Sequence, residues 1–247
     1  MLKKSIMAFA AVALLSACQP QKVSDEQLEQ AVAKYIKEHP GEVLNVIRTE
    51  AQKQAGGKPG GNPNQAQNNP AADKANIAKI MPKLQNAEHH ATIGDKNSKN
   101  VVVEFYDYNC GYCKKALETV TKLANEDKAK VILVELPVLG EASEKAAKAS
   151  TVVNTIAPAK FFEFHRYMLS AEGRADDAKI EAAVKAAGID LGKFKEELAK
   201  DKYAQLINEN REVANVMGIR GTPSFIVNDT FIRGARPYED FKASLKK

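Results

Sequence analysis

The 247-residue chain contains only three cysteines, no tryptophan and 6% aromatic residues. So few cysteines exclude a small fold that is held together by several disulfides. The net charge is +5, but lysines alternate with acidic residues and form no long basic block, which argues against a nucleic-acid-binding protein. Hydrophobic residues make up 44% of the chain and charged residues 27%, so the composition is that of a soluble protein with a sizeable core.

The N-terminal residues have the pattern of a secretory signal. Two lysines precede the apolar run at residues 6–15, which is too short to span a bilayer comfortably. The following Leu15-Ser16-Ala17-Cys18 resembles the lipobox of bacterial lipoproteins. This resemblance implies that residues 1–18 comprise a signal peptide and an acylated Cys18, and that the mature protein is anchored by lipid to a membrane.

The same N-terminal pattern also predicts the membrane and the compartment in which the mature protein lies. Gln19 stands where an aspartate would favour retention at the inner membrane, so the resemblance favours the outer membrane. A plain cleaved signal with an incidental cysteine is the alternative. Either reading places the mature protein in the bacterial cell envelope, facing the periplasm, where disulfides persist.

A helical arm and a linker are predicted before the main domain. Residues 19–55 form the arm, in which Ser24 and Gln27 make a capping-box pattern and Pro40 separates two short amphipathic helices. Such helices cannot bury their apolar sides alone. They require either other subunits, which predicts a homo-oligomer, or the protein's own domain. Residues 56–72, rich in Gly, Pro, Asn and Gln, have the composition of a flexible linker.

The remaining residues, 73–247, predict one α/β domain. A strand at residues 101–106 consists of β-branched and aromatic residues, as expected in a buried sheet, and a helix and a parallel strand follow it. Residues 141–216 are helical in character and form a long insertion before two further strands. The predicted elements are helices at 73–85 (with Pro82 inside it), 114–125 and 238–245, and strands at 92–93, 101–106, 131–138, 223–227 and 230–232.

Cys110 and Cys113 carry the clearest chemical signal. They stand at the predicted start of a helix that follows a buried strand, where unpaired amides and the helix dipole stabilise a thiolate at Cys110. The three-residue spacing brings Cys113 within reach on the first turn. We therefore predict that Cys110 is the exposed, attacking sulfur and Cys113 the resolving one. Gly111 and Tyr112 introduce no formal charge between them, so we expect weaker thiolate stabilisation than in strongly oxidising proteins.

Glu104 and Thr222-Pro223 are the other candidate site residues. Glu104 lies within the apolar strand, where desolvation should raise the pKa of its carboxyl group and allow it to exchange a proton with Cys113. The alternative is an outward-facing residue that makes a salt bridge. Pro223 begins a later strand and is either an ordinary strand-entry residue or part of the site.

Two segments in this order resemble the DsbA-like branch of the thioredoxin superfamily, over roughly residues 91–247. They are VEFYDYNCGYCK at residues 103–114 and GIRGTPSF at residues 218–225. The resemblance implies a thioredoxin fold with an inserted helical subdomain and a redox-active Cys110–Cys113 disulfide with no other cofactor. It also implies a cis proline at Pro223 facing the cysteines, with the Thr222 backbone, Gly111 and Tyr112 on the substrate side.

The same resemblance implies the reaction and its partners. The expected substrates are exported proteins that contain cysteine, and the expected redox partner is a membrane protein. The Gly111-Tyr112 pair, Thr222 and the helical arm resemble isomerases of this family more than its oxidases, so oxidase and isomerase both remain open.

Two rival functions follow from the same residues. The cysteines could join His39, His89, His90 or His165 in a metal site, but a tight zinc site needs four ligands at short spacings and only two are local, so we predict no metal. We interpret His89 and His90 as a solvated pair and His165 as part of a packed helix. The second rival is a non-catalytic envelope lipoprotein that binds peptides.

Overall fold

The computed structural model describes residues 25–38, 69–200 and 202–246, and it consists of two units, Met1–Gln65 and Ala66–Lys247. In the first unit the described element is helix α1, Asp25–Glu38. The predicted signal, Cys18, the capping box at Ser24, the helix after Pro40 and most of the predicted linker lie outside the described residues.

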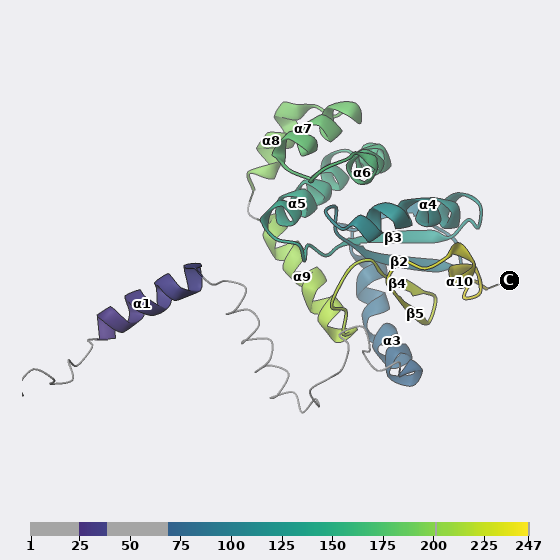
Figure 1. The fold of residues 1–247 in the computed structure, drawn as a ribbon. Coiled ribbons are helices and arrows are strands. Elements are labelled where there is room, and N and C mark those ends of the chain that lie inside the picture. The colour runs from purple at the N-terminus through teal and green to yellow at the C-terminus, as the bar shows by residue number, and fades with distance from the viewer. Residues whose placement is uncertain (1–24, 39–68, 201, 247) are drawn as a thin grey trace, which may run out of the picture. The chain divides into compact units, whose positions relative to one another are not determined.

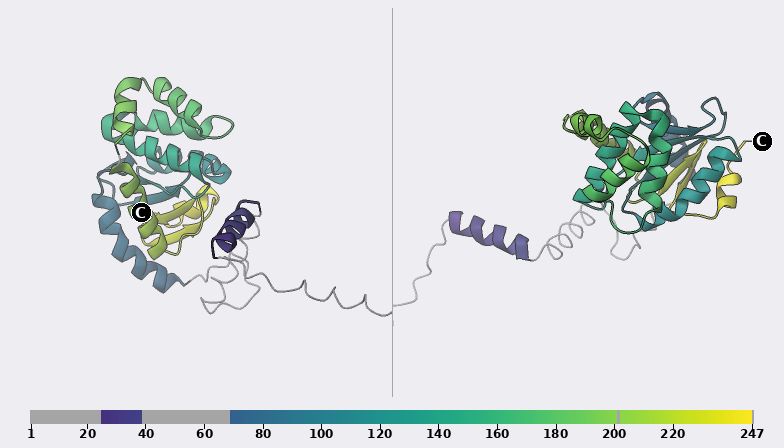
Figure 2. Two further views of the ribbon diagram at one scale, coloured as in Figure 1. Left: turned by 90° about the vertical axis from the view of Figure 1, so that its left-hand side faces the viewer. Right: turned by 90° about the horizontal axis from the view of Figure 1, so that it is seen from above.

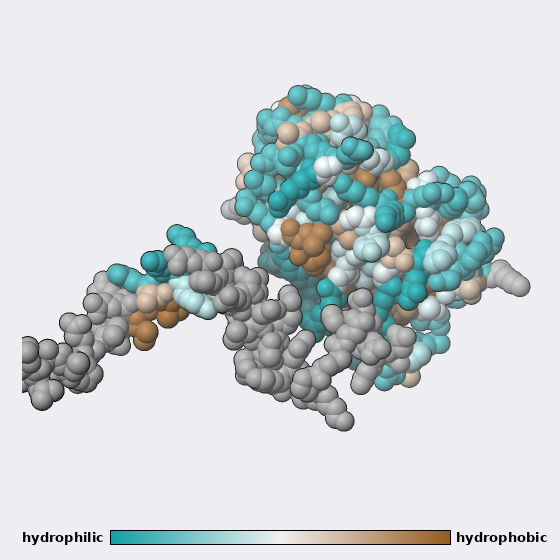
Figure 3. All heavy atoms as spheres, in the orientation of Figure 1, coloured by the Kyte–Doolittle hydropathy of each residue, from teal (hydrophilic) through white to brown (hydrophobic). Residues whose placement is uncertain are grey.

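Helix α1 presents an apolar stripe. Leu28, Val32 and Tyr35 follow helical spacing along one side, and each has about half of its surface exposed, at 56%, 50% and 51%. Figure 3 shows hydrophobic side chains gathered along one side of this helix and hydrophilic ones along another. The described part of the arm is therefore amphipathic, as the sequence predicts.

The second unit contains a mixed five-stranded sheet. Its strands are β1 (Ala91–Gly94), β2 (Val101–Tyr106), β3 (Lys130–Glu135), β4 (Ser224–Val227) and β5 (Thr230–Arg233), in the order β1-β3-β2-β4-β5. Strands β2 and β3 are parallel and the other pairs are antiparallel. The predicted strand-helix-strand unit with parallel strands is thus confirmed, and β2 is the central strand.

Helices cover both faces of the sheet (Figure 1). On one face, α3 (Pro70–Asn86) and the last turns of α9 (Lys202–Val216) pack on alternate residues of β2 such as Val103 and Phe105. On the other face, α4 (Gly111–Asn125) and α10 (Tyr238–Lys242) pack against Val102 and Tyr106. Because β2 has a strand on each side and helices on both faces, its residues from 102 to 106 are all buried.

The helical insertion extends from α5 to α9. Helices α5 to α8 are grouped together (Figure 2), whereas the end of α9 packs on the face of the sheet opposite α4. The elements of the insertion before α9 are α5 (Glu141–Ile156), the short η1 (Pro158–Lys160), α6 (Phe161–Ser170), α7 (Asp177–Ala186) and α8 (Leu191–Leu198). Asp176 and Asp190 cap α7 and α8 by accepting hydrogen bonds from the backbone amides three residues ahead. The thioredoxin-type fold with a helical insertion is thus confirmed.

Several predicted boundaries differ from those in the structure. Helix α3 begins at Pro70, within the predicted linker, because Asn69 caps it by accepting a hydrogen bond from the Ala72 amide and proline suits the first turn. Pro82 lies inside this helix without ending it. Strand β3 ends at Glu135, three residues before the predicted end and just ahead of Pro137, and α10 ends at Lys242 rather than residue 245.

Candidate active site

Cys110 lies at the N-terminal end of α4, directly after the loop that follows β2. Cys110 is the N-cap residue of this helix. The backbone N–H groups of the first helical turn have no partners within the helix and point toward the N-terminal end, where Cys110 lies. Its thiol donates a hydrogen bond to the Thr222 carbonyl oxygen at 3.1 Å, and 8% of the residue is exposed. The helix begins at Gly111, three residues earlier than predicted, which places both cysteines at its start.

The surroundings of Cys110 stabilise its thiolate. A hydrogen bond from the Cys113 thiol is the largest cause, and together with the Thr222 side chain and two backbone amides it lowers the pKa of Cys110 to about 5. Burial opposes this shift. At neutral pH such a sulfur is almost wholly thiolate, whereas a free cysteine with a pKa near 8.5 is mostly thiol.

Cys113 is the buried partner. It is completely inaccessible to solvent, and burial raises the pKa of its thiol well above the usual range, with the hydrogen bond to Cys110 and the charge of Glu104 acting in the same direction. The two cysteines are free thiols here. The pair therefore combines one sulfur with a lowered pKa, at a residue that is 8% exposed rather than fully exposed as predicted, with one protonated sulfur that is inaccessible to solvent.

The loop before β4 faces the cysteine pair. The peptide bond between Thr222 and Pro223 is cis, as the family resemblance implies. Thr222 is half-buried and its carbonyl lies against Cys110, while Pro223 is buried and its carbonyl accepts a hydrogen bond from the Gly234 amide at 3.0 Å. Although 112 residues separate them in sequence, Cys110 and Thr222 are thus direct neighbours.

Gly111 and Tyr112 form the outer side of the site. Both are exposed, and Tyr112 has 63% of its surface accessible. A Cβ atom added at Gly111 would meet nothing within 4 Å, so the space above this residue is open to a second molecule. The ammonium group of Lys115 lies 5.3 Å from the centre of the Tyr112 ring.

Glu104 is buried on the same face of the sheet as Cys113. It pairs with Leu133 on one side and Phe225 on the other, and only 1% of it is exposed. Burial raises the pKa of its carboxyl group to about 8, and the charge of Cys110 adds to the shift. Its Oε1 atom has no hydrogen-bond partner within the described structure. The alternative of an outward-facing residue with a salt bridge is excluded, because the central strand has no outward face.

A second buried acid, Glu135, lies at the end of β3. Its Oε1 accepts hydrogen bonds from Ser150 at 2.8 Å and from Tyr106 at 3.2 Å, and the Tyr108 hydroxyl continues the network from Ser150 to His165. Burial raises the pKa of Glu135 to about 7, although its hydrogen bonds act against the shift. The network joins both parallel strands to α5 and α6. We did not predict it, although an acid within an apolar strand was the available signal.

Asp107 is a second residue near the cysteines for which the sequence predicted no role. It follows β2 immediately and lies three residues before Cys110, and 3% of it is exposed. Its Oδ1 accepts a hydrogen bond from the Asn109 amide at 2.8 Å. Its Oδ2 accepts from the amides of Val138 and Leu139 at 2.9 and 3.1 Å. A polar residue in a turn after a strand carries no distinctive signal, since such residues are common in loops.

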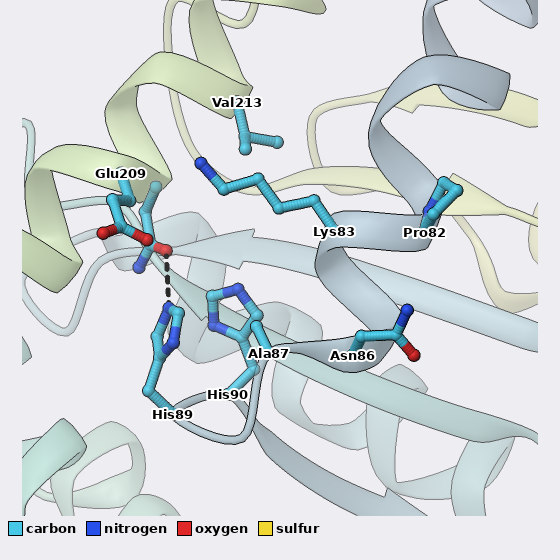
Figure 4. Close-up of a pocket in the computed structure, with 9 residues that line it drawn as sticks. Pro82, Lys83, Asn86, Ala87, His89, His90, Glu209 and Val213 are labelled. Carbon is cyan, nitrogen blue, oxygen red and sulfur yellow. Dashed lines mark hydrogen bonds between the residues drawn. The ribbon is translucent and has the colours of Figure 1, made fainter.

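The interpretation of His89 and His90 as a solvated pair is wrong. His90 is buried, and desolvation lowers its pKa to about 3. His89 is half-buried and its Nε2 lies 3.4 Å from the Asn210 side-chain oxygen (Figure 4). Both line a cavity of about 480 Å³ between α3 and α9, which contains neither cysteine. The cause is α3, whose packing beside α9 covers this turn. His165 is buried in α6, as predicted.

The described part of the chain offers neither a metal-binding cluster nor a helix that could cross a membrane. Within residues 25–38, 69–200 and 202–246, no three His, Cys, Asp or Glu side chains are grouped so that they could hold a metal ion. Among the helices that the structure describes, none has both the length and the apolar character that crossing a bilayer requires.

Comparisons with known proteins agree with this geometry. A family model described as thioredoxin matches residues 85–247. The solved structure of the thiol-disulfide exchange protein alpha-DsbA2 from Wolbachia pipientis is 32% identical, with a TM-score of 0.67, over 70% of this chain and 94% of that one.

Two other relatives cover different shares of the chain. A linker-deletion variant of Proteus mirabilis ScsC is 26% identical, with a TM-score of 0.64, and covers 92% of this chain and 96% of its own. Disulfide bond formation protein D of Bacillus subtilis is 25% identical over 166 residues, which is 63% of this chain and 75% of that protein. The chain belongs to the thioredoxin superfamily and is a DsbA-like protein disulfide oxidoreductase.

Proposed function

We propose that this protein forms or rearranges disulfides in exported proteins of the bacterial cell envelope, through Cys110-Gly111-Tyr112-Cys113. The observation that carries the proposal is the asymmetry of the pair. Cys110 keeps 8% of its surface exposed and has a pKa lowered to about 5, whereas Cys113 has no exposed surface and a raised pKa. Such a pair can form a mixed disulfide at one sulfur and release it with the other.

The surrounding residues then take distinct roles. Cys110 exchanges disulfides with the substrate, and Cys113 resolves the mixed disulfide. Glu104, buried on the same face and titrating near pH 8, accepts the Cys113 proton. Thr222, Pro223, Gly111 and Tyr112 surround Cys110 and contact the substrate chain. A membrane protein returns the pair to its starting redox state, and no cofactor is required beyond the Cys110–Cys113 disulfide.

A redox titration against glutathione buffers tests this proposal. The pKa of Cys110 lies between those of DsbA, about 3.5, and thioredoxin, about 7, so we expect a potential between their values of about −120 and −270 mV. A value near −120 mV would mark an oxidase, and one near −180 mV or below would favour isomerase or reductase activity. If the pair shows no reversible titration, the proposed function is wrong.

The cellular location rests on the N-terminal sequence. The pattern of residues 1–18 supports export and acylation at Cys18, and Gln19 supports the outer membrane. Radiolabelled palmitate should be incorporated into the full-length protein but not into a Cys18→Ala variant, and equal labelling of both would contradict the anchor.

The arm supports self-association. The stripe at Leu28 and Val32 of α1 is exposed, and pairing of such faces is a common way to bury them. We expect the protein without residues 1–18 to be an oligomer by light scattering, and Val32→Glu to weaken the assembly. Gln30→Glu, which adds the same charge on the opposite side of α1, should leave it intact. A monomeric parent protein would contradict this proposal.

A further inference from the structure

Asp107 ties together two loops that flank the redox pair. One loop, residues 107–110, leads from β2 to α4, and the other, residues 136–140, leads from β3 to α5. The Asp107 carboxyl group accepts three backbone hydrogen bonds, one from Asn109 in the first loop and two from Val138 and Leu139 in the second. Both carboxyl oxygens accept hydrogen bonds and the side chain is buried. If the carboxyl group were removed, water could not easily reach these three amides to take over as the acceptor.

The backbone of Asp107 contacts both cysteines. Its carbonyl oxygen accepts a hydrogen bond from the Cys110 amide at 3.0 Å. Its own amide donates to the Cys113 sulfur and lowers the pKa of that thiol, against the larger effect of burial. The position of this one peptide segment therefore influences where both sulfurs lie and favours negative charge on Cys113.

We propose that Asp107 is a positioning residue for the resolving step, in which Cys113 attacks the mixed disulfide at Cys110. By fixing its own backbone to the neighbouring loop, the Asp107 side chain holds the amide beside Cys113 and the carbonyl beside Cys110. This inference rests on the proposed roles of the two cysteines.

The step that Asp107 assists can be written for glutathione disulfide as the probe. The Cys110 thiolate attacks one glutathione sulfur, so a mixed disulfide forms and one glutathione thiolate leaves. Cys113 loses its proton to a base and attacks Cys110, so the Cys110–Cys113 bond forms and the second glutathione leaves. Glutathione disulfide is reduced to two thiols and the cysteine pair is oxidised. The sulfur of Cys113 gains negative charge in the second step alone, where the Asp107 amide faces it.

Asp107→Asn is the most specific variant, because it preserves the size and shape of the side chain. An amide offers one acceptor oxygen instead of two, and its NH₂ group would face backbone donors on one side. Rapid mixing of the reduced protein with glutathione disulfide, followed by acid quenching and mass spectrometry, measures both steps. We expect resolution to slow by about tenfold or more, so that the mixed disulfide accumulates. The first step should slow much less than resolution, because the amides at the start of α4 that stabilise the Cys110 thiolate remain in place.

Two other variants control the result. Ser143→Ala removes the 3.1 Å hydrogen bond that the Asn109 side chain donates to Ser143, and it loosens the same loop without touching the carboxyl group. It should resolve at nearly the rate of the parent protein. Asp107→Glu keeps two oxygens but moves them by one methylene, so it should also be slow. It supplies the measurement if Asp107→Asn does not fold by circular dichroism.

The possible outcomes separate the two proposals. Unchanged resolution in folded Asp107→Asn, or full rescue by Asp107→Glu, would overturn the positioning role. Equal slowing in Ser143→Ala would also overturn it, because general loosening of the loop would then explain the effect. If the parent protein forms no mixed disulfide at Cys110, the proposed function itself fails.

Discussion

Replacing Cys110 by serine is expected to reduce the rate of disulfide exchange by at least ~1000-fold. With a pKa of about 5, Cys110 is about 99% thiolate at pH 7, and the serine hydroxyl that replaces it is not ionised at that pH. Cys113 cannot substitute, because it is inaccessible to solvent and burial keeps it protonated. Turnover of a substrate with a reporter disulfide, measured with glutathione as reductant, gives the rate.

Cys113→Ser is the matched control for this experiment. This variant removes the Cys113 sulfur but leaves the reactive sulfur of Cys110, so it should still form a mixed disulfide and then fail to release it. The serine hydroxyl can still donate a hydrogen bond to the Cys110 sulfur, so the lowered pKa of Cys110 should be largely retained in the variant. Full activity of Cys110→Ser would show that exchange does not occur through this pair and would favour a non-catalytic role for the site.

The sequence was sufficient where a local pattern determined the structure. The run of apolar residues at 101–106 predicted a buried strand, and Cys110 at its end predicted a helix start with a reactive thiol. Glu104 was recognisable because it interrupts this apolar run. Its burial could not be decided from alternation alone, since that required β2 to have strands on both sides and helices on both faces.

What the sequence could not predict depends on contacts between distant segments. The role of Asp107 depends on hydrogen bonds from its carboxyl group to the amides of residues 138 and 139, which lie more than 30 residues later in the sequence. Glu135 belongs to a buried network only because α5 and α6 bring Ser150 and His165 to the end of its strand. Likewise His90 is a loop residue by pattern, and it is buried because α3 packs beside α9.

The Glu104 carboxyl group should make the stability of the protein depend on pH, whereas the side-chain amide of a Glu104→Gln variant should not. Below its ordinary pKa of 4.5 the group is protonated in both the folded and unfolded states, so it does not make the free energy of unfolding depend on pH. Between pH 4.5 and about 8 the unfolded chain loses this proton while the folded chain keeps it, so the folded state becomes less stable by about 1.4 kcal/mol per pH unit. Above about pH 8 the penalty is constant.

Glu104→Gln should therefore gain stability relative to the parent protein as the pH rises. The difference in free energy of unfolding between the two proteins should grow by about 3 kcal/mol from pH 4 to pH 7, measured by urea denaturation of the reduced forms. The comparison across pH removes any constant effect of burying an amide. Glu118→Gln, an exposed acid on α4 that pairs with Lys122, should show a change below about 0.5 kcal/mol.

The same substitution should slow catalysis, because the amide cannot accept the Cys113 proton. At pH 7 we expect resolution of the mixed disulfide to slow by about 100-fold, the lower end of the usual effect of removing a general base. The rate in the parent protein should rise through pH 8 as Glu104 ionises, and the variant should lack this rise. A variant that is more stable yet keeps the parent's rate and pH profile would show that Glu104 is only buried and carries no proton for Cys113. Gain of stability together with loss of rate would mean that this strand retains a destabilising acid for its chemistry.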